Sequence, residues 1–328
     1  MNANRRQVLS CLAAAGGAVL LPAAARADGA FPKQAMKIVI PFTAGSGTDV
    51  VGRAVSERLE KYFGQPVVID NRPGAGGTLG AAAVAAAPAD GYTLLVHSAG
   101  HVANAALYPA LKYDTQKDFV PLTMLAALPN VLVAAPSKGF KSVQDLVQKA
   151  KAEPNRYLYA SAGNGSATHI NAEKFRVAVG LQATHVPYRG TPEALTDVMG
   201  SRVDWFFAPL VSALPLIKDG RLQALAVGTP RRSPLLPEVP TTLEAGFAGS
   251  DYTFWVGLFA PAKTPADVLA RLHAETVKAL KSDEVRARLE KLGAETTPMA
   301  QADFAALVRN EIAATAALIK QAGIRVEA

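Results

Sequence analysis

The sequence is poor in cysteine, with one residue, Cys11, among 328. From residue 28 onward the chain therefore has no thiol with which to form a disulfide, attack a substrate or bind a metal. Cys11 stands before an apolar stretch rather than after one, so no lipid anchor is predicted. A chain without thiols is compatible with an oxidising compartment.

Clusters of basic residues and long apolar runs are also missing. No lysine and arginine cluster is interleaved with aromatic residues, and no zinc-finger or RNA-binding signature occurs, so no nucleic-acid partner is predicted. Three of the 34 basic residues and none of the 27 acidic ones precede residue 28, which leaves a mild net charge of +4. The apolar stretch 124–136 is interrupted by proline and predicts a buried strand rather than a membrane span.

Residues 1–27 have the pattern of an export signal. Arg5 and Arg6 form a basic start, an apolar stretch follows, and the small residues Ala25 and Ala27 precede the expected cleavage point. The paired arginines also fit the twin-arginine route, which the sequence does not separate from the Sec route. The segment is predicted to be removed and the remaining chain to be periplasmic.

Short β-rich runs alternate with amphipathic helical runs along the rest of the chain, which indicates an α/β fold. Residues 36–98 predict strand, helix, strand, helix and strand in that order. A second series of this kind occupies residues 142–229, and long helices are predicted from residue 266 onward. The chain is expected to pass between the two units near residues 130–136 and 252–262, which are extended and apolar.

The stretch "TAGSGTD", residues 43–49, joins a predicted strand to a predicted helix. It lacks the lysine of a phosphate-binding P-loop, and its glycines miss the spacing of a dinucleotide-binding motif. A glycine turn with hydroxyls at a helix N-terminus still favours an anion. Asp49 has an alternative interpretation as the N-cap of that helix.

The stretch "SAGNGSATH", residues 161–169, repeats this chemistry in the second unit. Neither loop contains lysine or arginine, so a bound carboxylate would be held by backbone N–H groups and hydroxyls. Several charge-assisted hydrogen bonds of about 1.5–3 kcal/mol each are sufficient for reversible binding. The pair of loops therefore predicts capture and release of a small anion.

Catalytic and metal-binding interpretations have less support. No G-x-S-x-G elbow occurs. His97 and His101 have the i, i+4 spacing of a zinc pair, but no third ligand clusters with them. His169 lies just inside a predicted helix start, where a structural role is expected. Arg189 is the best-placed single cation for an anion, although a surface turn explains it equally well.

Six segments follow one another along the chain. They are "IVIPFTAGSGTDVVGR", "GQPVVIDNRPGAGGTLGAAAVAAAPADGYTLL", "ASAGNGSATH", "HVPYRGTPEALTDVMGSRVDWFF", "LQALAVGTPRRSPLLPEVPTTLEAGF" and "FWVGLFAPAKTP". In this order they resemble the Bug family, the extracytoplasmic solute-binding proteins of tripartite tricarboxylate transporters. The resemblance covers essentially the whole chain after the export signal.

The resemblance implies a two-lobed periplasmic binding protein of the Venus-flytrap type, with a twisted mixed sheet flanked by helices in each lobe. Lobe 1 would comprise residues 30–133 plus 253–328, and lobe 2 residues 134–252. A monomer without metal or cofactor is expected. Its partners would be a small organic acid and the subunits of a membrane transporter.

The resemblance also implies a binding site, because family members grip a ligand carboxylate between the first loops of the two lobes. The loop at 98–104 and the turn at 188–190 would line the same cleft. Carried onto this chain, the ligand-binding residues are Phe42, Thr43, Ala44, Gly45, Ser46, Gly47, Thr48, Asp49, Ser98, His101, Ser161, Ala162, Gly163, Gly165, Ser166, Ala167, His169, Arg189 and Asp204.

One position departs from the family pattern, which usually reads A-G-G-x-T-D in the first loop. Ser46 replaces the second of these glycines, and the sequence leaves the role of the added hydroxyl open. The predicted function is a receptor that binds a small carboxylate and delivers it to a membrane transporter. The alternatives are a ligand sensor for a membrane kinase and an exported hydrolase, the latter disfavoured by the missing elbow and cysteine.

Overall fold

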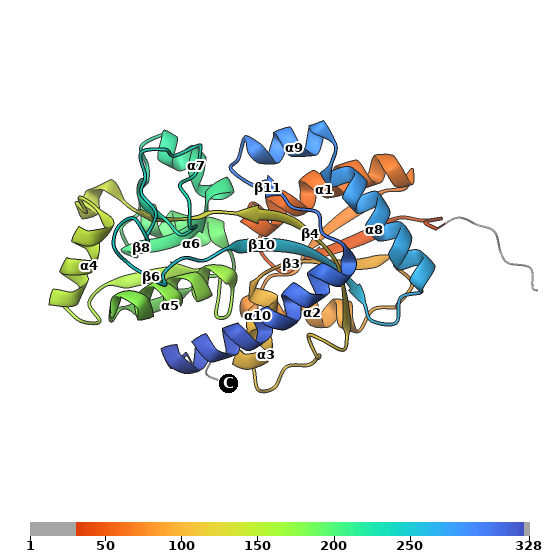
Figure 1. Cartoon of the computed structure of the whole chain (residues 1–328), viewed down its shortest axis with the longest axis horizontal. Helices are drawn as coiled ribbons and strands as arrows, with labels where there is room; N and C mark the ends of the chain where they lie inside the picture. Colours follow the sequence, from red (N-terminus) through yellow and green to blue (C-terminus); the bar gives the residue numbers. More distant parts are fainter. Residues whose placement is uncertain (1–30, 325–328) are drawn as a thin grey trace, which may run out of the picture.

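The computed structural model describes residues 31–324, so the predicted export signal lies outside the described residues. Two lobes lie side by side, each built on one mixed sheet flanked by helices (Figure 1). This confirms the predicted two-lobed α/β fold.

Lobe 1 contains a six-stranded sheet in the order β11-β4-β10-β3-β1-β2. β1 pairs in parallel with β2 and β3, whereas β10 runs antiparallel to β3 and β4. Helices cover the sheet, and four of the five residues of β1 are therefore buried. The strands are β1 (Met36–Ile40), β2 (Val67–Asn71), β3 (Thr93–Ser98), β4 (Phe119–Leu128), β10 (Phe254–Pro261) and β11 (Glu295–Thr296).

The helices of lobe 1 follow the predicted apolar stripes. In α1, Val51, Val55 and Leu59 are buried, and the helix ends where Gly64 adopts φ +63° and donates its N–H to the carbonyl of Glu60. This confirms the predicted C-cap. The helices are α1 (Gly47–Phe63), the short η1 (Ala75–Gly77), α2 (Thr78–Ala85), α3 (Gly100–Leu107), α8 (Ala266–Leu280), α9 (Asp283–Glu290) and α10 (Gln301–Ala322).

Lobe 2 contains a five-stranded sheet in the order β7-β6-β8-β5-β9. Its central strand β8 buries Trp205, Phe206 and Phe207 completely, as the sequence predicted for a core strand. The elements are β5 (Asn130–Ala134), η2 (Pro136–Lys138), α4 (Val143–Ala152), β6 (Leu158–Ser161), α5 (Ala167–Val179), β7 (Thr184–Pro187), α6 (Thr191–Met199), β8 (Trp205–Pro209), α7 (Leu210–Lys218) and β9 (Gln223–Val227).

The chain passes between the sheets at two places that lie side by side. Pro129 separates β4 from β5, and residues 228–253 lead from β9 back to β10. The N–H of Gly228 donates to the carbonyl of Asn130 at 2.8 Å, which ties the two passages together. The boundary expected between residues 133 and 134 falls inside β5, which pairs wholly within the second sheet. The first passage is therefore at Pro129.

Helix α10 lies along both lobes at the lower edge of the molecule in Figure 1. On the lobe 1 side, the indole N–H of Trp255 donates to Glu311 at 2.8 Å. Near its C-terminus, the carbonyl of Ala322 accepts from the Arg176 guanidinium of lobe 2 at 3.1 Å. Among residues 31–324, α10 and the other helices are too short or too polar to cross a membrane.

Candidate functional site

Three helices begin at the carboxyl ends of strands where the lobes face one another. α1 follows β1, α3 follows β3 and α5 follows β6. The starts of α3 and α5 are in close contact, because a Cβ on Gly100 would lie 2.8 Å from the carbonyl oxygen of Gly165 and 2.9 Å from the nitrogen of Ala167. Ligands of α/β proteins bind at this edge of the sheet.

A narrow inner cavity lies between the starts of α1, α5 and α6, with a volume of about 10 Å³. That is room for about one water molecule, so the lobes are closed on each other. None of the described residues that line it carries a charge. They are Phe42, Ser46, Gly47, Thr48, Ser98, Ala162, Ser166, Ala167, Thr168, Thr191, Pro209 and Phe254.

The inner cavity nevertheless favours an anion. The first N–H groups of a helix have no acceptor within that helix, and its dipole adds partial positive charge at this end. Gly47 and Thr48 in the first turn of α1 and Ala167 and Thr168 in the first turn of α5 belong to this part of their helices and line the cavity. The Oγ of Ser98 is buried at the cavity without a hydrogen-bond partner among residues 31–324. A hydroxyl in this position can donate a hydrogen bond to a water molecule or to a ligand oxygen.

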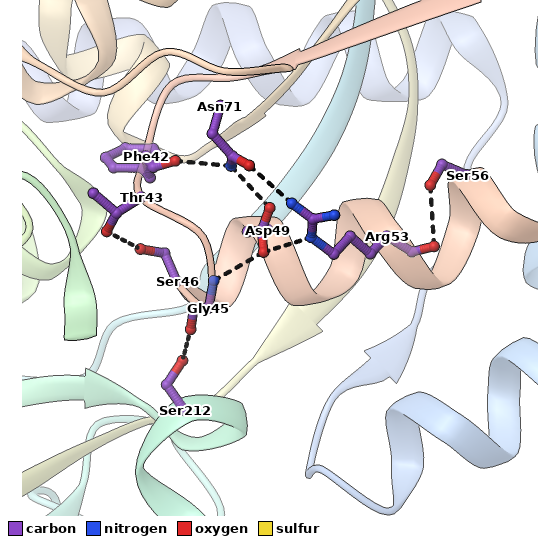
Figure 2. Close-up of polar contacts among 9 residues, drawn as sticks. All are labelled: Phe42, Thr43, Gly45, Ser46, Asp49, Arg53, Ser56, Asn71 and Ser212. Carbon is purple, nitrogen blue, oxygen red and sulfur yellow. Dashed lines mark hydrogen bonds and ion pairs between the residues drawn. The ribbon is translucent and has the colours of Figure 1, made fainter. Parts of the chain in front are cut away.

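Asp49 shapes the first loop from inside the protein and is not the N-cap that the sequence offered as an alternative. Ser46 holds the N-cap position, and Asp49 lies one turn further on. One carboxylate oxygen accepts the Gly45 N–H at 2.9 Å and the Arg53 Nε–H at 2.9 Å, and the other accepts the Asn71 amide at 2.8 Å (Figure 2). Asp49 therefore positions the loop and does not line the inner cavity.

We expect Asp49→Ala to lower the free energy of unfolding by about 2–3 kcal/mol, because a buried carboxylate loses three hydrogen bonds worth about 1 kcal/mol each. Urea denaturation checks this. Asp70→Ala is the matched control, since Asp70 is half-buried and pairs with Arg72 at the surface, where an ion pair is worth about 0–1 kcal/mol. Equal destabilisation by both variants would contradict the role of Asp49.

The second loop is held by its own side chains. Thr168 Oγ1 accepts the Ala162 N–H at 2.9 Å, and Ser161 Oγ accepts the Gly163 N–H at 3.0 Å. His169 Nδ1 accepts the Gly165 N–H at 3.1 Å, which requires a neutral ring. Burial lowers the pKa of His169 to about 4, so the ring is neutral at pH 7. His169 therefore has the structural role that the sequence predicted.

Ser161 and His185 have the spacing of a nucleophile and a base. The Oγ of Ser161 lies 2.6 Å from Nε2 of His185, whose ring stacks on that of His169 with centroids 4.0 Å apart. The Ser161 side chain is fully buried and does not line the described cavities of the cleft. Burial, followed by the neighbouring His169, lowers the pKa of His185 to about 3. A substrate cannot reach this pair without rearrangement of the loop.

A larger outer chamber, of about 420 Å³, adjoins the inner cavity at Ala162. Arg189 is exposed there, so the chamber has a cation that the inner cavity does not have. Its lining residues are Gly74, Ala75, Gly76, Tyr108, Ala162, Gly163, Asn164, Pro187, Tyr188, Arg189 and Glu193.

Two residues predicted for the site lie elsewhere. Asp204 precedes β8, at the amino end of the strands, where it accepts the Leu158 N–H at 2.7 Å and pairs with Lys138 at 2.6 Å. His101 is fully buried in lobe 1 against the rings of Tyr113, Phe119 and Phe259. Ligands bind at the carboxyl ends of the strands, so Asp204 lies at the wrong end, whereas His101 follows a carboxyl end but is closed off by its burial. Both residues are therefore structural in this protein.

Ten of the predicted residues line the two cavities: Phe42, Ser46, Gly47, Thr48, Ser98, Ala162, Gly163, Ser166, Ala167 and Arg189. Seven others belong to the same loops without lining either cavity: Thr43, Ala44, Gly45, Asp49, Ser161, Gly165 and His169. Some cleft residues were missed. The segment after Ser98 was expected to be a loop, but it forms α3 from Gly100. Gly76 and Tyr108 were not predicted, although both meet Asn164 of lobe 2. The glycine cluster at 74–77 was the available signal for this contact. His97 and His101 lie side by side, and no metal-binding group of three or more ligands occurs within residues 31–324.

Two α/β lobes closed over a cavity lined by uncharged residues have the architecture of a solute-binding protein. The chain also matches the TctC family, described as tripartite tricarboxylate transporter family receptor, over residues 51–324. The protein belongs to that family, which confirms the resemblance seen in the sequence.

Individual relatives agree with this assignment. The chain is 37% identical to a UPF0065 protein from the tcbD-tcbE intergenic region of Pseudomonas sp. strain P51, over 94% of this chain and 92% of that one. Rpa4515 of R. palustris with adipate superposes with a TM-score of 0.87 at 35% identity, covering 90% of this chain and 99% of that one. MatC of Rhodopseudomonas palustris with bound malate superposes with a TM-score of 0.84 at 35% identity, covering 88% of this chain and 100% of that one.

Proposed function

We propose that this protein binds a small organic carboxylate between its lobes and delivers it to a membrane transporter. The observation that best supports this function is that the starts of α1, α5 and α6 line one cavity together with Ser98, whose hydroxyl has no partner among the described residues. This arrangement stabilises a carboxylate without a basic side chain, so binding is reversible and no bond is broken. The adipate and malate of the two structural relatives are both dicarboxylates.

A dicarboxylate would place one carboxylate in the inner cavity and the other in the outer chamber. One carboxylate would enter between the starts of α1 and α5, as the lobes part and close again. The other end would extend into the outer chamber, where Arg189 is exposed. Closure is a hinge motion at Pro129 and residues 228–253, driven by contacts that both lobes make with the ligand.

The test is a thermal-shift panel of mono-, di- and tricarboxylates and aromatic acids on the chain from Asp28, with mass spectrometry of any co-purified ligand. We expect stabilisation by at least one dicarboxylate. Turnover of an ester or amide without binding of any acid would refute the receptor and support an exported hydrolase. Deletion of the transporter genes separates transport from sensing, because a sensor's response would survive the deletion.

We expect Arg189→Gln to weaken dicarboxylate binding about 10- to 150-fold, because a hydrogen bond to a charged group is worth about 1.5–3 kcal/mol. Binding of a monocarboxylate of equal length should change less than threefold. Isothermal titration calorimetry measures both. Arg202→Gln is the control, since it removes the same charge from lobe 2 at an exposed pair with Asp197. An equal loss of affinity for the dicarboxylate and the monocarboxylate would show that Arg189 does not bind the second carboxylate.

A further inference from the structure

Ser46, the residue that departs from the family pattern, has its partner in the other lobe. Its Oγ accepts the backbone N–H of Thr191, the first residue of α6, at 3.1 Å, and Ser46 is only 2% exposed. The residue before α6 is Gly190, whose missing side chain cannot cap the helix. Ser46 therefore supplies, from lobe 1, the N-cap bond of a helix in lobe 2.

The matching serine of the second loop works differently. Ser166 stands before α5 as Ser46 stands before α1, and its Oγ accepts the N–H of His169 in its own lobe at 3.3 Å. Among the described residues, Ser46 makes no such bond to α1. The hydroxyl of Ser46 is thus committed to a contact that exists only when the lobes meet.

Neighbouring groups strengthen this contact. Thr43 Oγ1 donates to Glu193 Oε2 in the first turn of α6 at 3.0 Å, and the hydroxyls of Thr43 and Ser46 lie 3.5 Å apart. A Cβ on Gly190 would lie only 1.9 Å from Thr43 Oγ1, so the glycine permits the approach. Ser212 of lobe 2 also donates to the Gly45 carbonyl at 2.9 Å (Figure 2).

We propose that Thr43 and Ser46 form, with Thr191 and Glu193, a closure latch that stabilises the closed state whether or not a ligand is bound. This proposal rests on the proposed function, in which the lobes close over the ligand when it binds. Contacts made only in the closed state raise its population without ligand and slow the release of ligand. Arg189 lies two residues before Thr191, so the latch also positions this cation at the outer chamber.

Lobe separation in the ligand-free protein tests the latch. The chain from Asp28 has no cysteine, so Leu79→Cys on α2 and Lys151→Cys on α4, both at exposed positions, give a unique pair for spin labels. Pulsed electron–electron double resonance then measures the distance between the two labels and so reports the closed and open populations. We expect Ser46→Ala and Ser46→Gly to lower the closed-to-open ratio about five- to tenfold, the usual strength of an N-cap bond.

Two further variants make the test specific. Ser56→Ala removes a buried hydroxyl of α1 whose one hydrogen bond within residues 31–324 goes to the Arg53 carbonyl, and it should leave the populations unchanged. Thr43→Val removes a hydroxyl that is not part of the inner cavity lining and should lower the ratio about threefold. Direct contact of Ser46 with a ligand cannot produce these shifts, because no ligand is present.

The outcomes separate the latch from the proposed function. If Ser46→Ala and Thr43→Val match Ser56→Ala in the ligand-free populations, and in the rate of dicarboxylate release by stopped flow, the latch is refuted. If the populations shift while no carboxylate binds, the latch stands and the proposed function fails. Thermal unfolding confirms that each variant is folded before the distances are compared.

Discussion

Replacing Gly76 by alanine is expected to weaken ligand binding by at least about 100-fold. Gly76 belongs to lobe 1, and a Cβ there would lie 1.8 Å from the carbonyl oxygen of Asn164 in lobe 2. That oxygen is a backbone atom, so it cannot turn aside, and the lobes must stay apart by more than 1 Å. The same carbonyl accepts the Tyr108 hydroxyl at 2.9 Å, a bond that separation would break.

Calorimetry with the best ligand of the panel measures the loss. Gly76 has φ +60°, so alanine also costs about 1–2 kcal/mol of backbone strain. Gly64→Ala is the matched control, because its φ is +63° and no described atom lies within 4 Å of its Cβ position. It should lose stability to a similar degree but keep its affinity. Unchanged affinity in Gly76→Ala would mean that ligands bind without this closure.

Acid is expected to unfold the protein near pH 5. Burial lowers the pKa of His97 and His169 to about 4, that of His185 to about 3, and that of His101 well below its usual 6.5. Below pH 6.5 these histidines therefore bind protons in the unfolded chain but stay neutral in the folded protein. Each histidine lowers the free energy of unfolding by about 1.4 kcal/mol per pH unit in this window. The four histidines together lower it by about 5 kcal/mol per pH unit. A typical domain has only about 5–15 kcal/mol to lose.

Urea denaturation at half-unit steps between pH 7.5 and 4.5 follows this loss. His101→Leu should flatten the slope by about a quarter, because one of the four protons is gone. Both ring nitrogens of His101 lack a partner among the described residues, so leucine should cost little at pH 7.5. A stability that stays constant from pH 6.5 to 4.5 would show that these histidines titrate normally in the folded state.

Local patterns were sufficient to predict most helices and strands. The apolar stripe of α1, its C-cap at Gly64 and the aromatic core strand at 205–207 each depend on neighbouring residues. Helix α3 was missed because small and polar residues start it at Ser98-Ala99-Gly100. An eight-residue helix has little stability of its own. It forms here because its buried face packs against α10 and the start of α5.

The two loops at the cleft were predicted, but the different roles of their serines were not. Ser46 and Ser166 occupy equivalent places in two similar loops, yet one caps a helix across the cleft and the other caps its own helix. Ser46 and Thr191 are 145 residues apart, so no local pattern links them. Asp204 was misplaced for a simpler reason, since it precedes its strand and the cleft lies where strands end.

The central place of β10 sets the order in which the lobes can fold. β10 lies between β3 and β4, so the sheet of lobe 1 is incomplete until residues 254–261 have joined it. All five strands of the other sheet lie within residues 130–227, an unbroken stretch of chain. Lobe 2 can therefore assemble by itself from one continuous segment. During synthesis the sheet of lobe 1 can be completed only after the whole of lobe 2 has been made, because the two segments of lobe 1 flank lobe 2 in the chain.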